Sequence, residues 1–154
     1  GAHTDYRGIE AQMKEFFKHR LGTVGLDVGI MDDQDVMNRN PPYATPLPDT
    51  FSGYPKFFMR YVRDSDFLTM EEAVQKTSTI PAKTFNLADR GTLVPGSYAD
   101  IVLMDLENLN HTGPPELTTT YPKGIQYVLV NGEIVVEKSK HTGSRPGSIL
   151  IRET

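Results

Sequence analysis

The pattern of apolar and polar positions predicts an amphipathic helix at the start of the chain. A helix running to about His19 places four apolar residues on one stripe, at Ile9, Met13, Phe16 and Phe17. Asp5 or Thr4 can cap the start of this helix, and Gly22 can end it. The spacing therefore predicts that the first element packs one face against a core.

Further helices are expected after residue 53. One runs near Tyr54 to Arg63, with Pro55 in its first turn, where a missing N–H costs little. Thr69 followed by Glu72 forms a capping box, in which each side chain accepts a backbone N–H of the other residue. This signal predicts that a helix begins directly after Thr69.

A separate short helix is expected after this one. Ser78 or Thr79 can cap it, with Pro81 near its first turn. Gly91 then breaks the helical pattern.

Strands are predicted in the second half of the chain. The apolar run Ala99 to Met104 suits a strand. Ile125 to Val130 and Glu133 to Glu137 flank Asn131-Gly132, a strong hairpin signal because a type I′ turn needs positive φ at both positions. A further strand is expected from Ser148 to Arg152.

Two blocks of sequence resemble a known family. The block from Leu68 to Asp105, and the block from Tyr121 to Glu137 with His141-Thr-Gly-Ser-Arg-Pro-Gly147 after it, are similar to the C-terminal part of the amidohydrolase superfamily. The similarity is greatest to the N-acyl-D-amino-acid deacylase (D-aminoacylase) group, with dihydroorotases and allantoinases more distant. This resemblance implies a metal-dependent (β/α)8 barrel that is closed by helices and followed by a small β-sandwich domain.

Chain length limits how much of that architecture is expected. A (β/α)8 barrel needs roughly 250 residues, and this chain has 154. We therefore expect an α+β fragment in which residues 1–90 form the C-terminal barrel segment, with its last strand, active-site loop and closing helices. Residues 91–154 would form the small β-sandwich domain. The chain begins with Gly1-Ala2 and has no initiator Met, which we interpret as a processed tag remnant or an engineered boundary and not as a natural start.

Asp27 is the candidate catalytic residue. The short apolar run Thr23 to Leu26 predicts a strand that delivers Asp27 to its C-terminal end, where barrel enzymes place their active sites. Without a family resemblance, the favoured interpretation of Asp27 is a polar residue that begins a turn after a strand. The resemblance implies that Asp27 ligates one metal and accepts a proton from the metal-bound water, which zinc brings to a pKa near 7.

A long loop, roughly Val28 to Thr50, follows this aspartate, and such loops are often functional. The resemblance implies that it contributes to the substrate pocket, with Tyr43 and Ser52 as candidate contacts. A proline-stiffened surface loop is the alternative. Many deacylases have His-Pro-Arg where this chain has Leu47-Pro48-Asp49. Asp49 thus puts an anion in place of a cation, which argues against recognition of the carboxylate of an acyl amino acid.

The histidines bear on metal binding. The chain has four, with no His-x-His pair, at His3, His19, His111 and His141. The resemblance implies zinc held by histidines upstream of the part represented here, and a zinc site needs three or four converging ligands. We therefore expect zinc in the full-length parent, no catalytic metal bound tightly by this chain alone, and no activity in isolation. His141 is expected to be a turn or packing residue.

Composition excludes several classes of partner. A net charge of −4 without a Lys/Arg run argues against nucleic acid. No stretch approaches ~20 apolar residues, which argues against a membrane span. The absence of cysteine excludes disulfides and fits a cytoplasmic protein. In the family the β domain also uses strands from the enzyme's N-terminus, so an isolated copy would expose sheet edges and form a homo-oligomer.

Two functions follow from these patterns. The first is the C-terminal fragment of a metal-dependent amidohydrolase that hydrolyses a C–N amide bond, with a small N-acyl amino acid as substrate of the parent enzyme. The second is a non-catalytic β-domain module of the same ancestry that serves structure or oligomer assembly.

Overall fold

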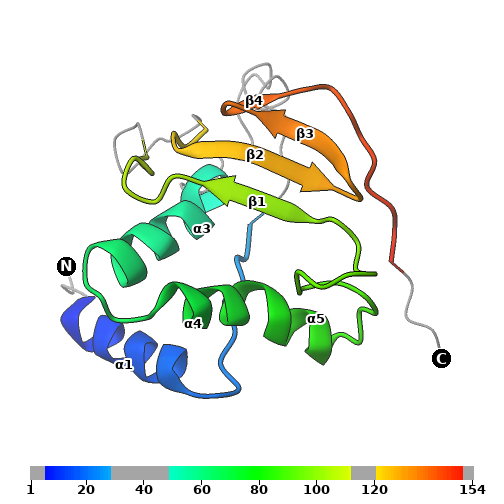
Figure 1. The fold of residues 1–154 in the computed structure, drawn as a ribbon. Coiled ribbons are helices and arrows are strands. Elements are labelled where there is room, and N and C mark those ends of the chain that lie inside the picture. Colours follow the sequence, from blue (N-terminus) through cyan, green and yellow to red (C-terminus); the bar gives the residue numbers. More distant parts are fainter. Residues whose placement is uncertain (1–5, 29–48, 112–120, 151–154) are drawn as a thin grey trace, which may run out of the picture.

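The computed structural model describes residues 6–28, 49–111 and 121–150 of the chain. A four-stranded antiparallel sheet lies over a layer of helices (Figure 1). The strands follow one another in chain order, β1-β2-β3-β4, and β1 is the strand that lies nearest the helices. The described residues thus have the predicted α+β character with a single sheet, and the barrel end and the β-sandwich remain predictions.

The helices make up the first half of the fold. Their segments are α1 (Tyr6–Lys18), α3 (Asp49–Phe58), the π-helical η1 (Met59–Arg63), α4 (Met70–Val74), the π-helical η2 (Gln75–Thr79) and α5 (Ile80–Thr84). None of the helices in the described ranges is long and apolar enough to cross a membrane.

Helix α1 confirms the predicted first helix but not the whole of its apolar stripe. Phe17 packs edge-on against Phe57 and Tyr61, with ring centroids 5.3 and 4.8 Å apart. The other three residues of the predicted stripe, Ile9, Met13 and Phe16, are exposed, at 42%, 40% and 73%. Figure 1 shows α1 at the margin of the helical layer.

The capping box at the start of α4 is confirmed. The Glu72 N–H donates to Thr69 Oγ1 at 3.2 Å, and the Thr69 N–H donates to Glu72 Oε2 at 2.8 Å. The predicted second cap is wrong, because α4, η2 and α5 follow one another without a break. Thr79 has helical backbone angles, and its hydroxyl instead donates to the Gly91 carbonyl at 2.7 Å.

Helix α3 begins earlier than predicted. It starts at Asp49, so Pro55 lies inside the helix and not in its first turn. The helix then widens into η1, where the Asp64 N–H donates to the Met59 carbonyl at 2.8 Å.

The strands agree more closely with prediction. They are β1 (Ile101–Met104), β2 (Ile125–Val130), β3 (Glu133–Glu137) and β4 (Lys140–His141). The Asn131-Gly132 hairpin is confirmed, with φ values of 49° and 84° that match the positive φ a type I′ turn requires. Ser148 to Leu150 form no strand, and the rest of that predicted strand lies outside the described residues.

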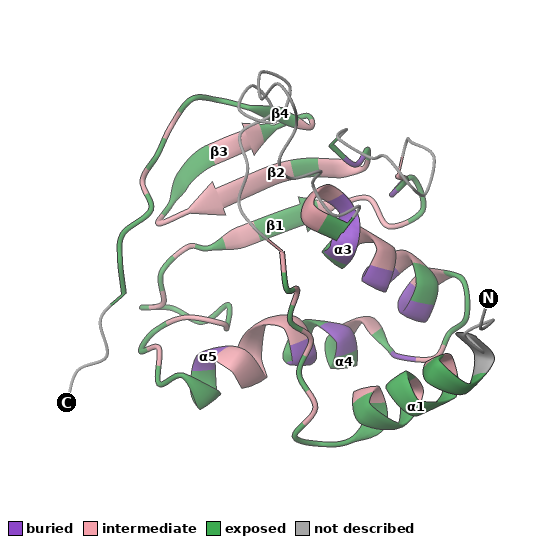
Figure 2. Cartoon of the chain, turned by 180° about the vertical axis from the view of Figure 1, so that it is seen from behind, coloured by how far each residue is buried: buried purple, intermediate pink, exposed green. Residues whose placement is uncertain are grey.

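The hydrophobic core lies in the helical layer (Figure 2). Its buried residues come from α3, η1, the turn that follows and α4, with one contribution from beyond β1, and they are Phe57, Phe58, Tyr61, Val62, Leu68, Ala73 and Leu109. The strands are only half-buried or exposed, and Val102 in β1 is 53% exposed. The sheet therefore keeps apolar surface on which further protein could pack.

Arg63 joins the helical layer to the segment after β1. Its guanidinium donates to the Leu109 carbonyl at 2.5 Å and to the Leu106 carbonyl at 3.3 Å, and it pairs with Asp64. The hydrogen bond with Asp64 raises the pKa of Arg63, which stays charged. This contact fixes the helices against the sheet that covers them.

Candidate functional site

The candidate site is the extended segment from Thr23 to Val28, which leads from α1 to Asp27. Side chains alternate along it, since Val24, Leu26 and Val28 are half-buried while Thr23, Gly25 and Asp27 are exposed. The predicted strand is not formed here, because the hydrogen-bonding partner of the segment is a helix and none of the described strands pairs with it. The alternation nevertheless turns Asp27 outward, as a strand would.

Three hydrogen bonds fix the position of this segment. The Val24 N–H donates to the Lys76 carbonyl at 3.1 Å. The Tyr54 hydroxyl donates to the Val24 carbonyl at 3.4 Å. The Lys76 Nζ donates to the carbonyl of His19 at 3.0 Å, at the end of α1. Both polar groups of the Val24 backbone are thus satisfied by the helical layer.

Packing fixes the same segment one residue before Asp27. Leu26 lies directly against Gly53, such that a Cβ on Gly53 would fall 2.5 Å from Leu26 Cδ1. That separation is too short for two carbon atoms, so a Cβ at this position of α3 would displace the Leu26 side chain. Asp27 follows Leu26 and Ser52 precedes Gly53, so the contact brings Asp27 and Ser52 into the same region.

The predicted site residues differ in their surroundings. Asp27 is exposed, and none of the described residues forms a hydrogen bond or ion pair with it. Ser52 is fully buried in α3. Tyr43 lies outside the described residues.

Asp49, the anion that replaces an expected cation, is neutralised within its own helix. Lys56 Nζ lies 3.0 Å from Asp49 Oδ1, and both side chains are partly exposed. The pair leaves less negative charge near the start of α3 than the sequence alone indicates.

The described residues do not make a zinc site by themselves. No three His, Cys, Asp or Glu side chains converge within the described ranges. His141, the last residue of β4, accepts the Gly143 N–H at its Nδ1 at 2.9 Å, and His19 Nδ1 accepts the Leu21 N–H at 3.3 Å. Asp27 fits a single ligand position, whereas zinc takes three or four.

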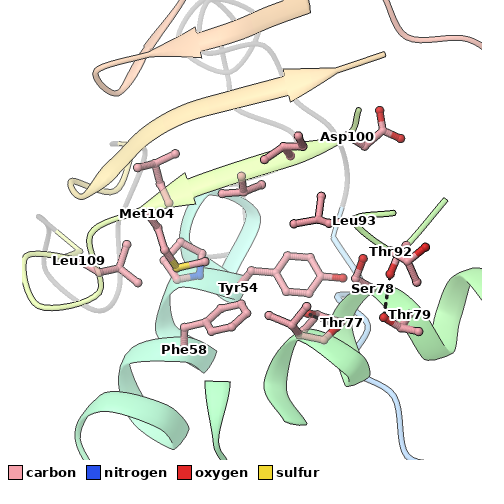
Figure 3. A pocket seen from close by; sticks show the side chains of 16 residues that line it. Tyr54, Phe58, Thr77, Ser78, Thr79, Thr92, Leu93, Asp100, Met104 and Leu109 are labelled. Carbon is pink, nitrogen blue, oxygen red and sulfur yellow. Dashed lines mark hydrogen bonds between the residues drawn. The ribbon is translucent and has the colours of Figure 1, made fainter. Parts of the chain in front are cut away.

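A separate apolar groove of about 640 Å³ lies between β1 and the helices (Figure 3). Figure 3 shows Tyr54, Phe58 and Thr77 on its helical side and Met104 on its sheet side. Its one carboxylate, Asp100, pairs with Arg90. Asp27 does not line the groove, and no set of ionisable side chains converges in it, so we do not assign the chemistry to it.

A family model described as "Amidohydrolase family" matches residues 7–136 of the chain. The matched residues include the segment from Thr23 to Val28, the helical layer and all but the last residue of the first three strands. This chain belongs to the amidohydrolase family.

The similar proteins point to one branch of that family. The chain is 35% identical over 144 residues to an N-acyl-D-glutamate deacylase from Alcaligenes xylosoxydans xylosoxydans. This match covers 94% of this chain and 27% of the relative. It also matches the structure of N-acyl-D-glutamate deacylase from Bordetella bronchiseptica complexed with zinc and a phosphonate inhibitor that mimics the tetrahedral intermediate. That match has a TM-score of 0.73 and 32% identity, and covers 92% of this chain and 27% of the other.

A further match is an aspartate-to-alanine mutant of D-aminoacylase in complex with CuCl2. It has a TM-score of 0.66 and 36% identity, and covers 70% of this chain and 23% of the other. The chain spans about a quarter of the length of the curated relatives it matches first, at 27% and 26%.

Proposed function

We propose that this chain supplies the C-terminal part of a zinc-dependent N-acyl-D-amino-acid deacylase, and that it is inactive when isolated. The observation that carries the proposal is the exposed Asp27 carboxylate at the end of a segment held by the helical layer. The similarity to an N-acyl-D-glutamate deacylase over 94% of the chain supports the same reaction class. The missing zinc ligands would come from the rest of the protein.

Asp27 would be both a metal ligand and the catalytic base. Zinc in the complete protein would supply Lewis acidity that lowers the pKa of a water molecule toward 7. The Asp27 carboxylate accepts a proton as that water attacks the amide carbonyl carbon. The same proton then passes to the leaving nitrogen as the C–N bond breaks, which gives a carboxylic acid and a free amino acid.

The substrate proposed is a small N-acyl amino acid. Tyr43 remains a proposed contact from the loop before α3. Full burial of Ser52 favours a role in packing α3 over direct contact with the substrate. The Asp49–Lys56 pair lessens the objection that an anion at this position repels a substrate carboxylate.

The assembly and location of the protein are also proposals. Exposed apolar side chains on β1, such as Val102 and Leu103, favour association with another copy or with the remainder of the enzyme. A monodisperse monomer of the isolated chain in light scattering would argue against the homo-oligomer. A cytoplasmic location rests only on the absence of cysteine. A non-catalytic module is not favoured, because the matched relatives are enzymes throughout.

Replacement of Asp27 tests the proposed chemistry. We would express the reading frame that contains this chain together with its upstream sequence, load it with zinc, and compare wild type with Asp27→Asn. Removal of a general acid–base group costs typically about 10²- to 10⁴-fold in kcat. Asp66→Asn is the matched control, since Asp66 is exposed and its φ of 48° suits asparagine equally well. Equal rates for wild type and Asp27→Asn would refute the catalytic assignment.

A further inference from the structure

Lys76 is a buried lysine on the helical layer. It is 6% exposed and lies in η2. Lysine is almost never fully buried unless it is paired, because its charge loses hydration. None of the described carboxylates forms an ion pair with Lys76, and the recorded partner of its Nζ is the His19 carbonyl at 3.0 Å. An apolar side chain would fill the same space at lower cost, so packing alone does not account for this residue.

Lys76 forms two hydrogen bonds with the chain before Asp27, one through its side chain and one through its backbone carbonyl. Its ammonium binds the His19 carbonyl just after α1, where helix carbonyls carry partial negative charge. Its own carbonyl accepts the Val24 N–H at 3.1 Å. Lys76 therefore holds both ends of the connection from His19 to Val24, which leads into the extended segment.

Contacts from α3 also hold the extended segment. The Tyr54 hydroxyl binds the Val24 carbonyl, and Leu26 is seated against Gly53. Asp27 follows directly after these anchored residues, and its own side chain has no partner among the described residues. Within the described residues, these anchored neighbours are what holds the backbone that carries the Asp27 carboxylate.

We propose that Lys76 is a positioning residue for Asp27, an inference that rests on the function proposed above. The Lys76 side chain holds the connection after α1 so that the Asp27 carboxylate meets the reacting water at one fixed place. A displacement of about 1 Å in a reacting group can cost about 10²-fold in rate. Loss of the Lys76 ammonium should therefore lower kcat without loss of the fold.

The test is Lys76→Met in the complete zinc-loaded protein, which keeps the length of the side chain and removes the donor. We expect kcat to fall at least about tenfold with KM changed less than about threefold, as for an interaction used mainly in the transition state. In the Asp27→Asn background the same change should cost less than about twofold, because the two residues act as a unit. Lys83→Met is the control, since Lys83 is exposed and its ammonium has no partner among the described residues.

Hydrogen exchange gives a readout that does not depend on turnover. Lys76→Met should speed amide exchange in residues 20–27 relative to wild type and to Lys83→Met. If Lys76→Met fails to fold, Lys76→Leu replaces it, since it also removes the donor and leaves a shorter apolar side chain in the buried position. Wild-type kcat and exchange in these variants, with Asp27→Asn still inactive, would overturn the inference and leave the proposed function standing. A wild-type protein that hydrolyses no N-acyl-D-amino acid would overturn both.

Discussion

Leu109 links the helical core to the segment after β1, and its truncation should destabilise the protein strongly. The side chain is 1% exposed and belongs to the main hydrophobic cluster. Leu109→Ala removes about three carbon groups worth about 0.8 kcal/mol each, or about 2.4 kcal/mol in transfer free energy. The backbone at Gly124 lies so close that a Cβ there would be 2.6 Å from Leu109 Cα, which limits collapse around the cavity. With the cavity term added, we expect a loss of about 3 to 4 kcal/mol.

Urea denaturation followed by circular dichroism measures this loss. Leu93→Ala is the matched control, because the same atoms are removed from a side chain that is 77% exposed. We expect Leu93→Ala to cost less than about 0.5 kcal/mol. Equal losses for the two variants would refute the placement of Leu109 in the core.

Three further changes test local features of the fold. Thr69→Ala removes the cap of α4 and should cost about 1 kcal/mol in thermal or urea unfolding, and no loss would contradict the capping box. Gly132→Ala should cost about 1 to 2 kcal/mol because its φ is +84°, whereas Gly147→Ala in open space should be near neutral in the same assay. The Asn108 side chain lowers the pKa of Asp105 by hydrogen bonding, so the stability it adds is present above about pH 4 and lost as the pH falls further. Asn108→Ala should therefore destabilise more at pH 6 than at pH 2, and an equal effect at both would contradict this linkage.

Local chemistry in the sequence predicted several elements well. The Asn131-Gly132 turn and the Thr69 capping box depend on neighbouring residues alone, and both are confirmed. The cap expected near Thr79 failed because its hydroxyl found a partner at Gly91, and the helix continued through it. Propensity at one position could not show that a distant carbonyl would compete for the same hydroxyl.

The candidate site was predicted only in part for the same reason. Asp27 follows a recognisable apolar run, but the segment is fixed by a helix and not by a neighbouring strand. Lys76 carries no sequence signal of burial, since its contact with His19 spans 57 positions of the chain. The fit of Gly53 against Leu26 is equally invisible to local patterns, because it requires the two segments to be packed first.

We propose that this chain supplies Asp27 as the catalytic base of a complete deacylase. The most direct measurement is the release of free amino acid from N-acetyl-D-glutamate and N-acetyl-L-glutamate by the complete zinc-loaded protein and its Asp27→Asn variant. We expect the wild type to hydrolyse the D-substrate and to hydrolyse little of the L-substrate. We expect the rate on the D-substrate to be about 10²-fold or more lower in the variant. Equal hydrolysis by wild type and variant, or none of any N-acyl-D-amino acid by wild type, would contradict it.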